Sequence, residues 1–417
     1  MRIQINTFGT EGDIRPFVAL ACGLTAAGHR AAICTADGYG PLVTSGGVEH
    51  LPMDDTARIL IKAAMPTMVG PAGSVRLVRR MIAAMRQMIG DEWAAAQSWE
   101  PDVIVYHPKC LGALHIAERL DLPAVVSLSL PFFTPTGAFP IPFIGNWPLG
   151  ARANRASYRF NNVTMLAYGA MINNFRRQTL GLSARPRIDN LLNRDDGSPV
   201  PILYSFSRHI VPVPDDYPGH AHVTGSWFDD RAAAWQPSPD LEHFLAAGDP
   251  PVYVGFGSMG FGRSSQQRTE LLLRTLIDTG HRVIMATGWG GLTANTGGIP
   301  ADQVQVVESI PHDWLFPRTR AVIHHGGAGT TVAGLRAGRP TLICPVLGDQ
   351  PFWGHQVHRI GAGPAPIPQR RLDRDRFEAA VHQLADDRIR RNAADLGRLI
   401  QAEDGIAKAI AVIEELR

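Results

Sequence analysis

The sequence predicts an α/β protein built from two doubly wound parallel-sheet domains that face each other across a cleft. At 417 residues the chain exceeds what one hydrophobic core usually supports, so two domains of roughly 200 residues each are expected. Short apolar runs alternate with helical patterns in the first half, and the second half repeats this alternation. Such alternation is typical of parallel sheets covered by helices on both faces.

The expected elements follow in chain order. In the first half, strands are predicted at "RIQINTF", "RAAICTA", "PDVIVYH" and "PAVVSLS", with helices at "IRPFVALACGLTAAGH" and "LGALHIAERLDL". In the second half, strands are predicted at "PPVYVGFGS", "HRVIMAT", "VQVVES", "AVIHHG" and "PTLICPV". Helices are expected at 268–279 and 330–337, and amphipathic helices follow to the end.

The segment "SFSRHIVPVPDDYPGHAHVTGSWFDD" lies between the two halves and has the character of a linker. It is rich in Pro, His and Gly and has little helical period. We therefore expect a first domain over 1–216 and a second domain that begins at Tyr217. Ligands of doubly wound sheets bind beyond the carboxyl ends of the strands, so the loops that follow the strands should line the cleft.

Composition excludes several classes of protein. A net charge of +2 with 19% charged residues lacks the basic bias of a nucleic-acid binder. The four cysteines have neither zinc-site spacing nor disulfide density, so we expect core residues in a reducing, cytoplasmic compartment. The N-terminus reads as a strand rather than a signal peptide, and no apolar run reaches the roughly 18 residues of a spanning helix.

The first strand-to-helix loop, "FGTEGDIRPF", does not fit a dinucleotide site. The G-x-G-x-x-G spacing is absent, and Glu11 and Asp13 stand where a pyrophosphate would meet the helix N-terminus. Two carboxylates would repel that group. From the loop alone, Asp13 is either a helix cap, which is the commonest reason for an Asp there, or a general base that faces the cleft.

The corresponding loop of the second half, "VIHHGGAGTTVAGLRAG", predicts an anion site. Its glycines allow backbone N–H groups to approach a ligand closely, and the helix that follows has its positive end at the same spot. The loop is not a P-loop, because the G-K-[ST] ending is missing. His324 and the adjacent His325 would supply side-chain donors to a diphosphate that must also leave.

Other loops are expected at the same cleft. "GFGSMGFGRSS" offers Ser258, "ESIPHDWLF" offers a turn whose main chain reads a base, and "LICPVLGDQPFWGHQ" places Asp349 beside Gln350, an acceptor and an amide suited to sugar hydroxyls. No metal site is expected: the only D-x-D, Asp373 with Asp375, reads as the acidic first turn of a helix. No zinc or triad motif is present in the sequence.

Taken together, "FGTEGDIRPFVALACGLTAAGH", "GFGSM", "SIPHDWLFP", "HHGGAGTTVAGLRAGRPTLICPVLGDQPFWGHQV" and "IGAGP" resemble the UDP-glycosyltransferase superfamily. The resemblance covers nearly the whole chain and is greatest to sterol glucosyltransferases and to bacterial enzymes that glycosylate antibiotics and lipids. It implies a GT-B fold, in which two Rossmann-like domains hold the acceptor (1–216) and a nucleotide sugar (217–400), and the final helix, 401–417, crosses back to the first domain.

The resemblance also implies roles for individual residues. Asp13 resembles the base that deprotonates the acceptor hydroxyl, which favours the second of the two interpretations above. On the donor side it assigns the diphosphate to His324 and the backbone of the glycine-rich turn, the base to the backbone of Ile310, and the sugar to the Asp–Gln pair. The donor-binding residues are then Ser258, Trp289, Ile310, His324, Gly326, Gly327, Gly329, Thr330, Asp349 and Gln350.

Three departures from the family pattern qualify these roles. Many relatives have a basic residue where Glu11 stands. The aromatic that stacks on uracil in the plant branch is absent near Ser309, which leaves TDP open beside the favoured UDP. Plant enzymes use a His–Asp dyad, but the first loop here has no His, so Asp13 is expected to act alone or with help from His107, which ends a strand of the same sheet.

The predicted function is inverting, metal-independent transfer of a hexose, with glucose favoured, to a hydroxyl of an apolar sterol, lipid or polyketide-like acceptor, without a cofactor. The acceptor side is assigned to the aromatic loop with Phe132, Phe133, Phe143 and Trp147, and the Arg-bearing, Met-rich helix "LVRRMIAAMRQMIG" is compatible with contact at the inner face of a membrane. Three alternatives stay open: transfer of a TDP-deoxysugar to a peptide antibiotic or glycolipid, a nucleotide-sugar-binding protein without catalysis, and a Rossmann-type oxidoreductase, which the acidic first loop opposes. Monomer and homodimer both stay open.

Overall fold

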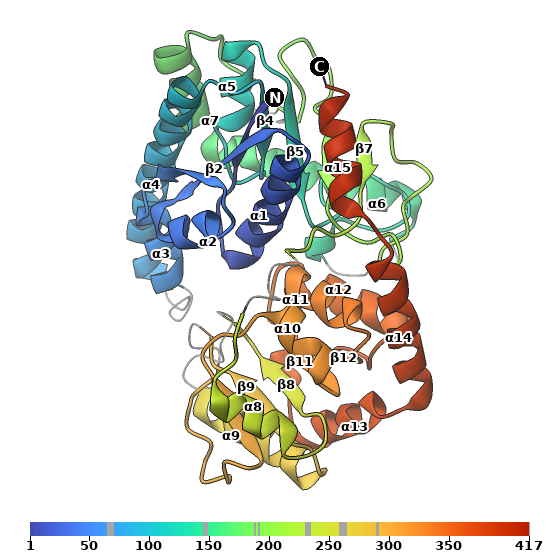
Figure 1. Ribbon diagram of the computed structural model, residues 1–417. Helices are drawn as coiled ribbons and strands as arrows, with labels where there is room; N and C mark the ends of the chain where they lie inside the picture. The colour runs from blue at the N-terminus through green and yellow to red at the C-terminus, as the bar shows by residue number, and fades with distance from the viewer. Residues whose placement is uncertain are drawn as a thin grey trace.

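The computed structural model describes residues 1–64, 71–144, 149–186, 189–190, 192–229, 235–257, 265–288 and 292–416. In the described chain, two parallel sheets form the centres of two α/β domains, the first domain above the second in Figure 1. The predicted fold class is therefore confirmed. The strands are short apolar runs such as "VIVY" and "VYVG" whose residues are all buried, as expected where helices cover both faces.

The first sheet has the strand order β3-β2-β1-β4-β5-β6-β7 and every pairing is parallel. Its strands are β1 (Arg2–Asn6), β2 (Arg30–Ala36), β3 (Glu49–Met53), β4 (Val103–Tyr106), β5 (Ala124–Leu128), β6 (Ile202–Tyr204) and β7 (Ala221–Val223). The helices of this domain are α1 (Glu11–Ala26), α2 (Gly40–Thr44), α3 (Thr56–Ala64), α4 (Pro71–Trp99), α5 (Ala113–Leu120), α6 (Ala151–Ser157) and α7 (Val163–Phe175). Short 3-10 turns η1 (Asp37–Tyr39), η2 (Pro142–Ile144) and η3 (Tyr158–Asn162), and the π-helical turn η4 (Arg176–Leu180), complete it.

The second sheet has the order β10-β9-β8-β11-β12 and is also parallel throughout. Its strands are β8 (Val252–Gly255), β9 (Val283–Ala286), β10 (Val304–Val307), β11 (Ala321–His324) and β12 (Thr341–Ile343). The helices are α8 (Pro239–Ala246), α9 (Ser265–Asp278), α10 (His312–Leu315), α11 (Ala328–Arg336), α12 (Gln350–Arg359), α13 (Arg374–Leu384) and α14 (Asp387–Gln401), with 3-10 turns η7 (Phe316–Arg318) and η8 (Gln369–Arg371).

The expected division of the chain at 216/217 falls inside the first sheet, before its last strand. β7 lies beyond that position and pairs with β6. This strand is only three residues long, half-buried and at the sheet edge, so the sequence around it has no apolar alternation to distinguish it from a linker. The edge strand β3, "EHLPM", was also missed, because only Met53 is buried and the strand contains a proline.

The last helix, α15 (Gly405–Glu414), packs on the first domain, although α14 before it packs on α11 of the second (Figure 1). Ile406 contacts α1 at Gly23, where a Cβ would lie 2.3 Å from its Cγ2. The indole of Trp227 donates a hydrogen bond of 3.2 Å to the carbonyl of Gly405. The chain therefore crosses between the domains a second time at its end.

None of the four cysteines, all of which lie in the described residues, forms a disulfide, and three of them (Cys34, Cys110 and Cys344) are buried, as expected of core residues. Within the described residues, no helix combines the length and the apolar character needed to cross a membrane.

Candidate active site

The two sheets place their candidate loops at equivalent points. In the first sheet the order of strands reverses between β1 and β4, whose last paired residues are Asn6 and Tyr106. In the second it reverses between β8 and β11, whose last paired residues are Gly255 and His324. Ligands of doubly wound sheets bind at such switch points. The loops that follow these four strands are therefore the expected site.

Asp13 lies in the first turn of α1, directly after β1, and its carboxylate accepts contacts from two loops. Oδ2 accepts hydrogen bonds from the backbone N–H of Thr10 at 2.8 Å and from its hydroxyl at 3.2 Å. The ammonium group of Lys109 lies 2.9 Å from the same oxygen. Oδ1 lies 3.5 Å from Nε2 of His107. The loops after β1 and β4 are thus joined through one carboxylate.

The charge state of Asp13 follows from these contacts. Burial raises the pKa of Asp13. The charges of Lys109 and His107 and the hydrogen bonds from Lys109 and Thr10 lower it by more, so the pKa lies below its usual value. The carboxylate is therefore ionised at neutral pH. Its Oδ2 is fully occupied, so Oδ1 is the oxygen available to take a proton.

Nε2 of His107 faces Oδ1 of Asp13 at 3.5 Å, a close contact rather than a hydrogen bond. Burial and the charge of Lys109 lower the pKa of His107 to about 3, so the ring is neutral. Its Nδ1 accepts a hydrogen bond of 3.2 Å from the backbone N–H of Lys109, which assigns the ring proton to Nε2, the atom that faces Asp13. His107 then has no free lone pair, so it orients Asp13 rather than taking a proton itself.

The two interpretations of Asp13 are compatible. The bond from the Thr10 N–H to Oδ2 is a helix cap. Capping uses one carboxylate oxygen and leaves the other directed to the β4 loop. The capping bond fixes the side chain in one orientation, which a general base requires.

His324 ends β11 and is fully buried. Burial, with His325 and His312 nearby, lowers its pKa well below 6.5, so the ring is neutral. Its Nδ1 accepts a hydrogen bond of 3.0 Å from the N–H of Gly326, which leaves the proton on Nε2. That Nε2–H has no hydrogen-bond partner among the described residues. A buried donor without a partner is costly, which is a reason to expect a ligand acceptor here.

The glycines after His324 shape the turn into α11. Gly326 has φ +99°, and a Cβ there would lie 2.7 Å from Cγ2 of Ile343. Gly327 precedes the helix, whereas Gly329 and Thr330 are in its first turn. A Cβ at Gly329 would meet no atom within 4 Å, so the space in front of this turn is open. The helix N-terminus thus presents free N–H groups to an open space, as an anion site does.

Asp349 and Gln350 begin α12, and both side chains already have partners in the protein. Asp349 accepts a hydrogen bond of 3.0 Å from the indole N–H of Trp353. Gln350 accepts from the N–H groups of Val346 at 2.7 Å and Leu347 at 3.3 Å. These bonds fix the loop after β12. Burial raises the pKa of Asp349, and the charge of Asp13 raises it further.

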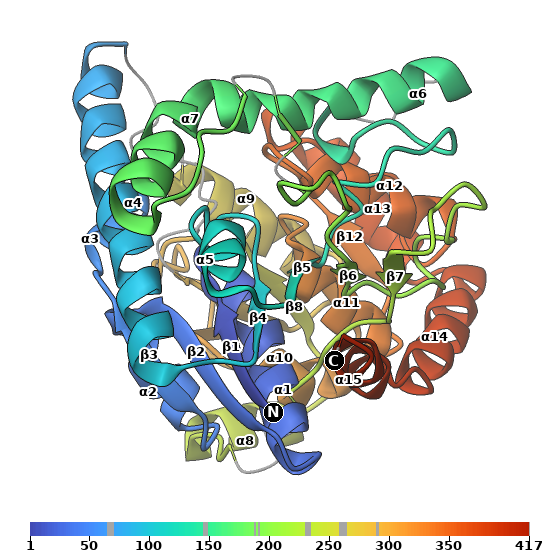
Figure 2. The ribbon, with the colours of Figure 1, turned by 90° about the horizontal axis from the view of Figure 1, so that it is seen from above.

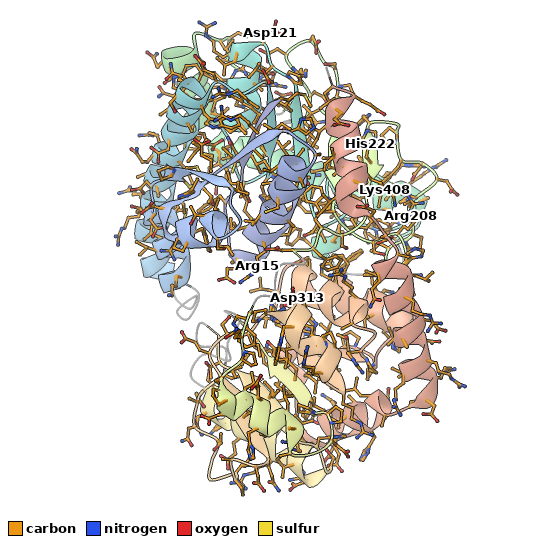
Figure 3. The ribbon with its side chains drawn as sticks, in the orientation of Figure 1. Arg15, Asp121, Arg208, His222, Asp313 and Lys408 are labelled. Carbon is orange, nitrogen blue, oxygen red and sulfur yellow. The ribbon has the colours of Figure 1, made fainter. Side chains whose placement is uncertain are left out.

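The loop that carries Asp13 in the first domain lies near the loop that carries Asp349 in the second. The charge of Asp13 acts on Asp349 of the second domain, as does that of Lys109. The charge of Arg15 lowers the pKa of Asp313, although burial raises it more. In Figure 3, Arg15 lies at the lower end of α1 and Asp313 at the facing edge of the second domain. The expected cleft therefore lies between the N-terminal ends of α1 and of the second-domain helices.

The aromatic residues assigned to the acceptor form one cluster. The ring of Phe132 lies 5.1 Å from that of Phe133 and 4.9 Å from that of Phe143. Phe143 reaches the second domain, since a Cβ on Gly348 would lie 3.4 Å from its ring. Phe139 contacts Phe352 of α12 at 5.9 Å. The aromatic loop thus borders the loop that carries Asp349.

The remaining predicted residues are distributed as follows. Ile310 is buried just before α10, among Leu315 and Phe316. Ser258, Trp289 and Trp147 lie outside the described residues. In the described part of the chain, no group of three or more His, Cys, Asp or Glu is arranged to hold a metal ion.

Sequence reasoning missed Lys109 as the charge partner of Asp13. The signal was present, because Lys109 is one of three lysines in the chain and lies two residues after a strand-end histidine. A loop residue two positions from a candidate is a natural neighbour of the same site. What the sequence could not supply was the pairing of β1 with β4, which brings the two loops together.

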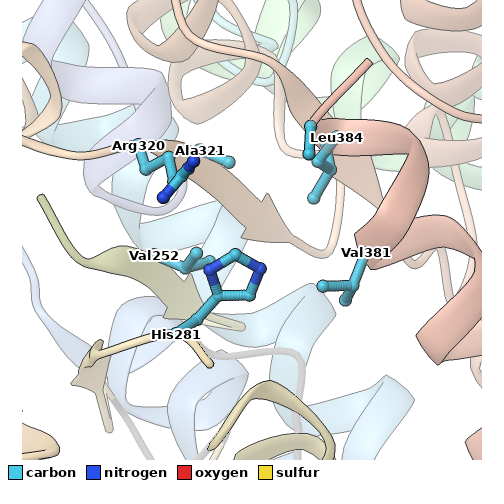
Figure 4. Close-up of a pocket in the computed structure, with 7 residues that line it drawn as sticks. Val252, His281, Arg320, Ala321, Val381 and Leu384 are labelled. Atoms are coloured by element: carbon cyan, nitrogen blue, oxygen red, sulfur yellow. The ribbon is translucent and has the colours of Figure 1, made fainter. Parts of the chain in front are cut away.

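Figure 4 shows a small pocket elsewhere in the second domain. It is lined by Val252, His281, Arg320, Ala321, Val381, Leu384 and Ala385. Val252 begins β8 and Ala321 begins β11, so this pocket lies at the amino ends of the strands. It is at the opposite edge of the sheet from His324 and is separate from the candidate site.

Two family matches cover most of the chain. Residues 3–137 match the N-terminal domain of glycosyltransferase family 28. Residues 270–408 match the C-terminal domain of the erythromycin biosynthesis protein CIII-like family. The first match covers β1 to β5 of the first sheet, and the second covers β9 to β12 of the second sheet.

Relatives match along nearly the full length of this chain. Two sterol 3-beta-glucosyltransferases of Arabidopsis thaliana are 35% and 33% identical over 98% of this chain, and the match covers 64% and 67% of their own length. The sterol 3-beta-glucosyltransferase of Aspergillus fumigatus is 32% identical over 99% of this chain and 30% of its own. The chain thus spans about two thirds of the plant relatives and about 30% of the fungal one.

Solved glycosyltransferases share the fold at low sequence identity. The glycosyltransferase of kitacinnamycin has a TM-score of 0.73 at 19% identity and matches 100% of this chain and 98% of its own. The calicheamicin glycosyltransferase has a TM-score of 0.67 at 18% identity, with coverage of 100% and 98%. The glycosyltransferase VinC, solved with DTDP, has 0.67 at 18%, with coverage of 100% and 99%. The chain adopts the two-domain GT-B fold and belongs to the glycosyltransferase family that includes the sterol 3-beta-glucosyltransferases.

Proposed function

We propose that this protein transfers a hexose, with glucose favoured, from a nucleoside-diphosphate sugar to a hydroxyl of an apolar acceptor, with inversion and without a required metal. UDP is the favoured nucleotide, and TDP is the alternative. The proposal rests on one observation above all: α1, which carries the ionised carboxylate of Asp13, contacts α11, the helix that follows the buried His324, whose Nε2–H has no described partner. A base and an anion site opposite each other are what glycosyl transfer needs.

The acceptor step assigns Asp13 the role of base. Oδ1 of Asp13 accepts the proton of the acceptor hydroxyl as the oxygen forms a bond to the anomeric carbon. The bond from that carbon to the diphosphate oxygen breaks, and its electron pair leaves with the nucleoside diphosphate. The hydroxyl attacks from the side opposite the leaving group, so the configuration at the anomeric carbon inverts. His107 and Lys109 keep the carboxylate oriented and ionised until it takes the proton.

The negative charge that develops on the leaving diphosphate is proposed to be stabilised by residues of the second domain. The Nε2–H of His324 and the N–H groups of the first turn of α11 meet the diphosphate oxygens as negative charge grows on them. Gly329 leaves the room that a phosphate requires. Asp349 and Gln350 are proposed to meet the hydroxyls of the sugar with the atoms that their bonds to the α12 loop leave free.

The acceptor class is proposed to be a sterol or a comparably flat, apolar alcohol. The relatives named above act on sterols, and the Phe132 cluster offers aromatic surface next to the cleft. Apolar acceptors need such a wall, because they have few polar groups to hold.

The test is a direct assay of transfer. The purified protein is incubated with UDP-glucose or TDP-glucose and a 3-hydroxysterol in the presence of EDTA, and the glycoside is identified by mass and its anomeric configuration by NMR. The proposal expects a β-glycoside from an α-linked donor. Retention of configuration, strict dependence on an added metal, or nucleotide binding without transfer to any alcohol would each overturn part of it. Calorimetric binding of NAD in place of UDP or TDP would overturn all of it.

A further inference from the structure

One segment of the first domain has an unusual balance of charge. From Leu122 to Ile188 the chain contains seven arginines and neither Asp nor Glu, although the whole chain has 38 acidic residues against 40 basic ones. Large apolar side chains are also exposed in this segment. They are Phe143, Ile144, Leu149, Phe160 and Leu166.

Much of the segment is a continuous helical rod. α6, η3, α7 and η4 follow one another from Ala151 to Leu180, and Figure 2 shows α6 and α7 along one outer edge of the molecule. α7, "VTMLAYGAMINNF", contains no charged residue. A helix of that kind is ordinarily buried on all sides. Here Leu166 is 54% exposed, and the neighbouring Ala167 and Ala170 are exposed as well.

The inner side of the rod holds the acceptor loop. The side chain of Asn154 donates to the carbonyl of Gly137 at 2.8 Å, and that of Asn161 donates to the carbonyl of Phe132 at 3.0 Å. The hydroxyl of Ser157 accepts from the N–H of Ile141 at 2.9 Å. These three residues recur at the spacing of one helical face. The rod therefore positions the backbone of the aromatic loop.

The outer side of the rod carries exposed apolar side chains and arginines rather than side chains that bind the protein's own loop. Its exposed residues recur at three- and four-residue steps, with apolar side chains in the middle and arginines at both ends. We call this set the outer stripe; it consists of Arg152, Arg155, Arg159, Phe160, Leu166, Ala167, Ala170 and Arg177. An apolar centre flanked by arginines is the pattern of a helix that lies in the interface of a membrane.

We propose that the outer stripe docks on an anionic lipid surface and so holds the aromatic acceptor loop at the membrane. The charge of the outer stripe favours a lipid surface over a second copy of the chain as its partner. A two-fold contact would bring arginines against arginines, and the stripe itself has no carboxylate to pair with them. Asp216 lies nearby but already pairs with Arg155 at 2.7 Å. Anionic headgroups supply the complementary charge, and the acyl region accepts Phe160 and Leu166.

The inference rests on the proposed function in one respect, since an apolar acceptor that resides in a bilayer gives the docking its use. The loop bound by Asn154 and Asn161 would then lie next to the source of the acceptor. The surface can be tested without any sugar donor, so the two proposals can fail separately.

The experiment is co-sedimentation of the full chain with vesicles of phosphatidylcholine alone and of phosphatidylcholine mixed with phosphatidylglycerol. The wild type is expected to bind the mixed vesicles more strongly, and added salt should weaken the binding. Each of the single substitutions Arg152→Ala and Arg159→Ala should weaken partitioning into the mixed vesicles about fivefold. The double variant Phe160→Ser, Leu166→Ser should lose most of the remaining binding.

Matched controls come from the second domain. Leu399 of α14 is 49% exposed, close to Phe160 at 50%, and Arg388 of the same helix is exposed. Leu399→Ser and Arg388→Ala should bind like the wild type, and all variants should transfer glucose to a short, water-soluble alcohol equally in the absence of vesicles. No binding by the wild type, equal loss in the controls, or a dimer in light scattering that the stripe variants dissociate would overturn the proposal. A wild type that binds vesicles but transfers no sugar would support the surface and contradict the proposed function.

Discussion

The ammonium group of Lys109 lies 2.9 Å from Oδ2 of Asp13 and joins the loop after β4 to the first turn of α1. This ion pair counteracts burial, which by itself would raise the pKa of Asp13. The carboxylate is thus ionised well below neutral pH, while its second oxygen stays directed to His107. Lys109 therefore sets the pH range in which Asp13 can act as a base.

Replacement of Lys109 by Met should move the acid limb of the kcat profile to higher pH. The substitution removes the main influence that lowers the pKa of Asp13, so the carboxylate protonates at a less acidic pH. Activity depends on the ionised form and is lost as the pH falls through that pKa. The measurement is kcat against pH for both proteins.

Two variants control this prediction. Lys109→Arg keeps the charge and should leave the acid limb near its original position. Lys408→Met removes a lysine on α15 and should not change the profile. An acid limb that is identical in Lys109→Met and the wild type would show that the ion pair does not govern the base.

Replacement of His324 by Gln should weaken binding of the nucleoside diphosphate by about ten- to hundredfold, because a hydrogen bond to a charged group is lost or misplaced. Titration calorimetry with UDP measures this change. His382→Ala, on the exposed face of α13, is the control, and the melting temperature checks that the turn at Gly326 still forms. Equal affinities for UDP would remove His324 from the diphosphate site.

Two glycines of the same turn should behave differently. Gly329→Val adds a side chain where a Cβ meets nothing, so the fold should tolerate it, but the side chain would fill the space proposed for the phosphate. Gly326→Ala forces a Cβ into Ile343 at a φ of +99° and should destabilise the protein by about 1–3 kcal/mol. Urea unfolding and UDP titration of both variants separate the effects. Loss of UDP binding with unchanged stability is expected only for Gly329→Val, and the reverse pattern would contradict the assignment.

Glu92 of α4 should make the stability of the protein depend on pH. Burial raises its pKa to about 8, although it accepts a hydrogen bond of 3.0 Å from Asn6. A folded-state pKa above the unfolded value of about 4.3 means that the folded protein binds the proton more tightly, so its contribution falls as the pH rises from the unfolded to the folded pKa. Glu92→Gln should therefore raise the melting temperature more at pH 8 than at pH 5. Glu378→Gln, an exposed glutamate of α13, should raise it at neither pH.

The sequence predicted most of the strands and the loops at the switch points, because buried parallel strands read as short apolar runs between helices. The edge strands β3 and β7 carry no such signal and were missed, and β6, which is buried but only three residues long, was missed as well. His107 and His324 were found because a polar residue follows or ends an apolar strand, and Asp13 because it lies in the loop and first helical turn after the first strand. The orientation of the His107 ring depends on the N–H of Lys109, which donates to its Nδ1, and no residue pattern encodes that contact.

The partners of Asp349 and Gln350 also depend on three-dimensional contacts. In the sequence, an adjacent acid and amide indicate a pair that binds sugar hydroxyls. In the structure, Asp349 already accepts a hydrogen bond from Trp353, and Gln350 already accepts one from the N–H of Val346. The acceptor cluster was predictable as a set, because Phe132, Phe133 and Phe143 share one proline-rich loop. Its support by Asn154 and Asn161 was not, since those residues lie on the inner face of helices whose register is set by packing.

The most direct test of the central claim compares the wild type with Asp13→Asn in the transfer of glucose from UDP-glucose to a 3-hydroxysterol. Asn preserves the size of the side chain and an acceptor for the Thr10 N–H, but it cannot take the proton. Turnover should fall by about a hundred- to ten-thousandfold while calorimetric affinity for UDP stays near that of the wild type. Turnover of Asp13→Asn equal to that of the wild type would contradict the assignment of Asp13 as the base.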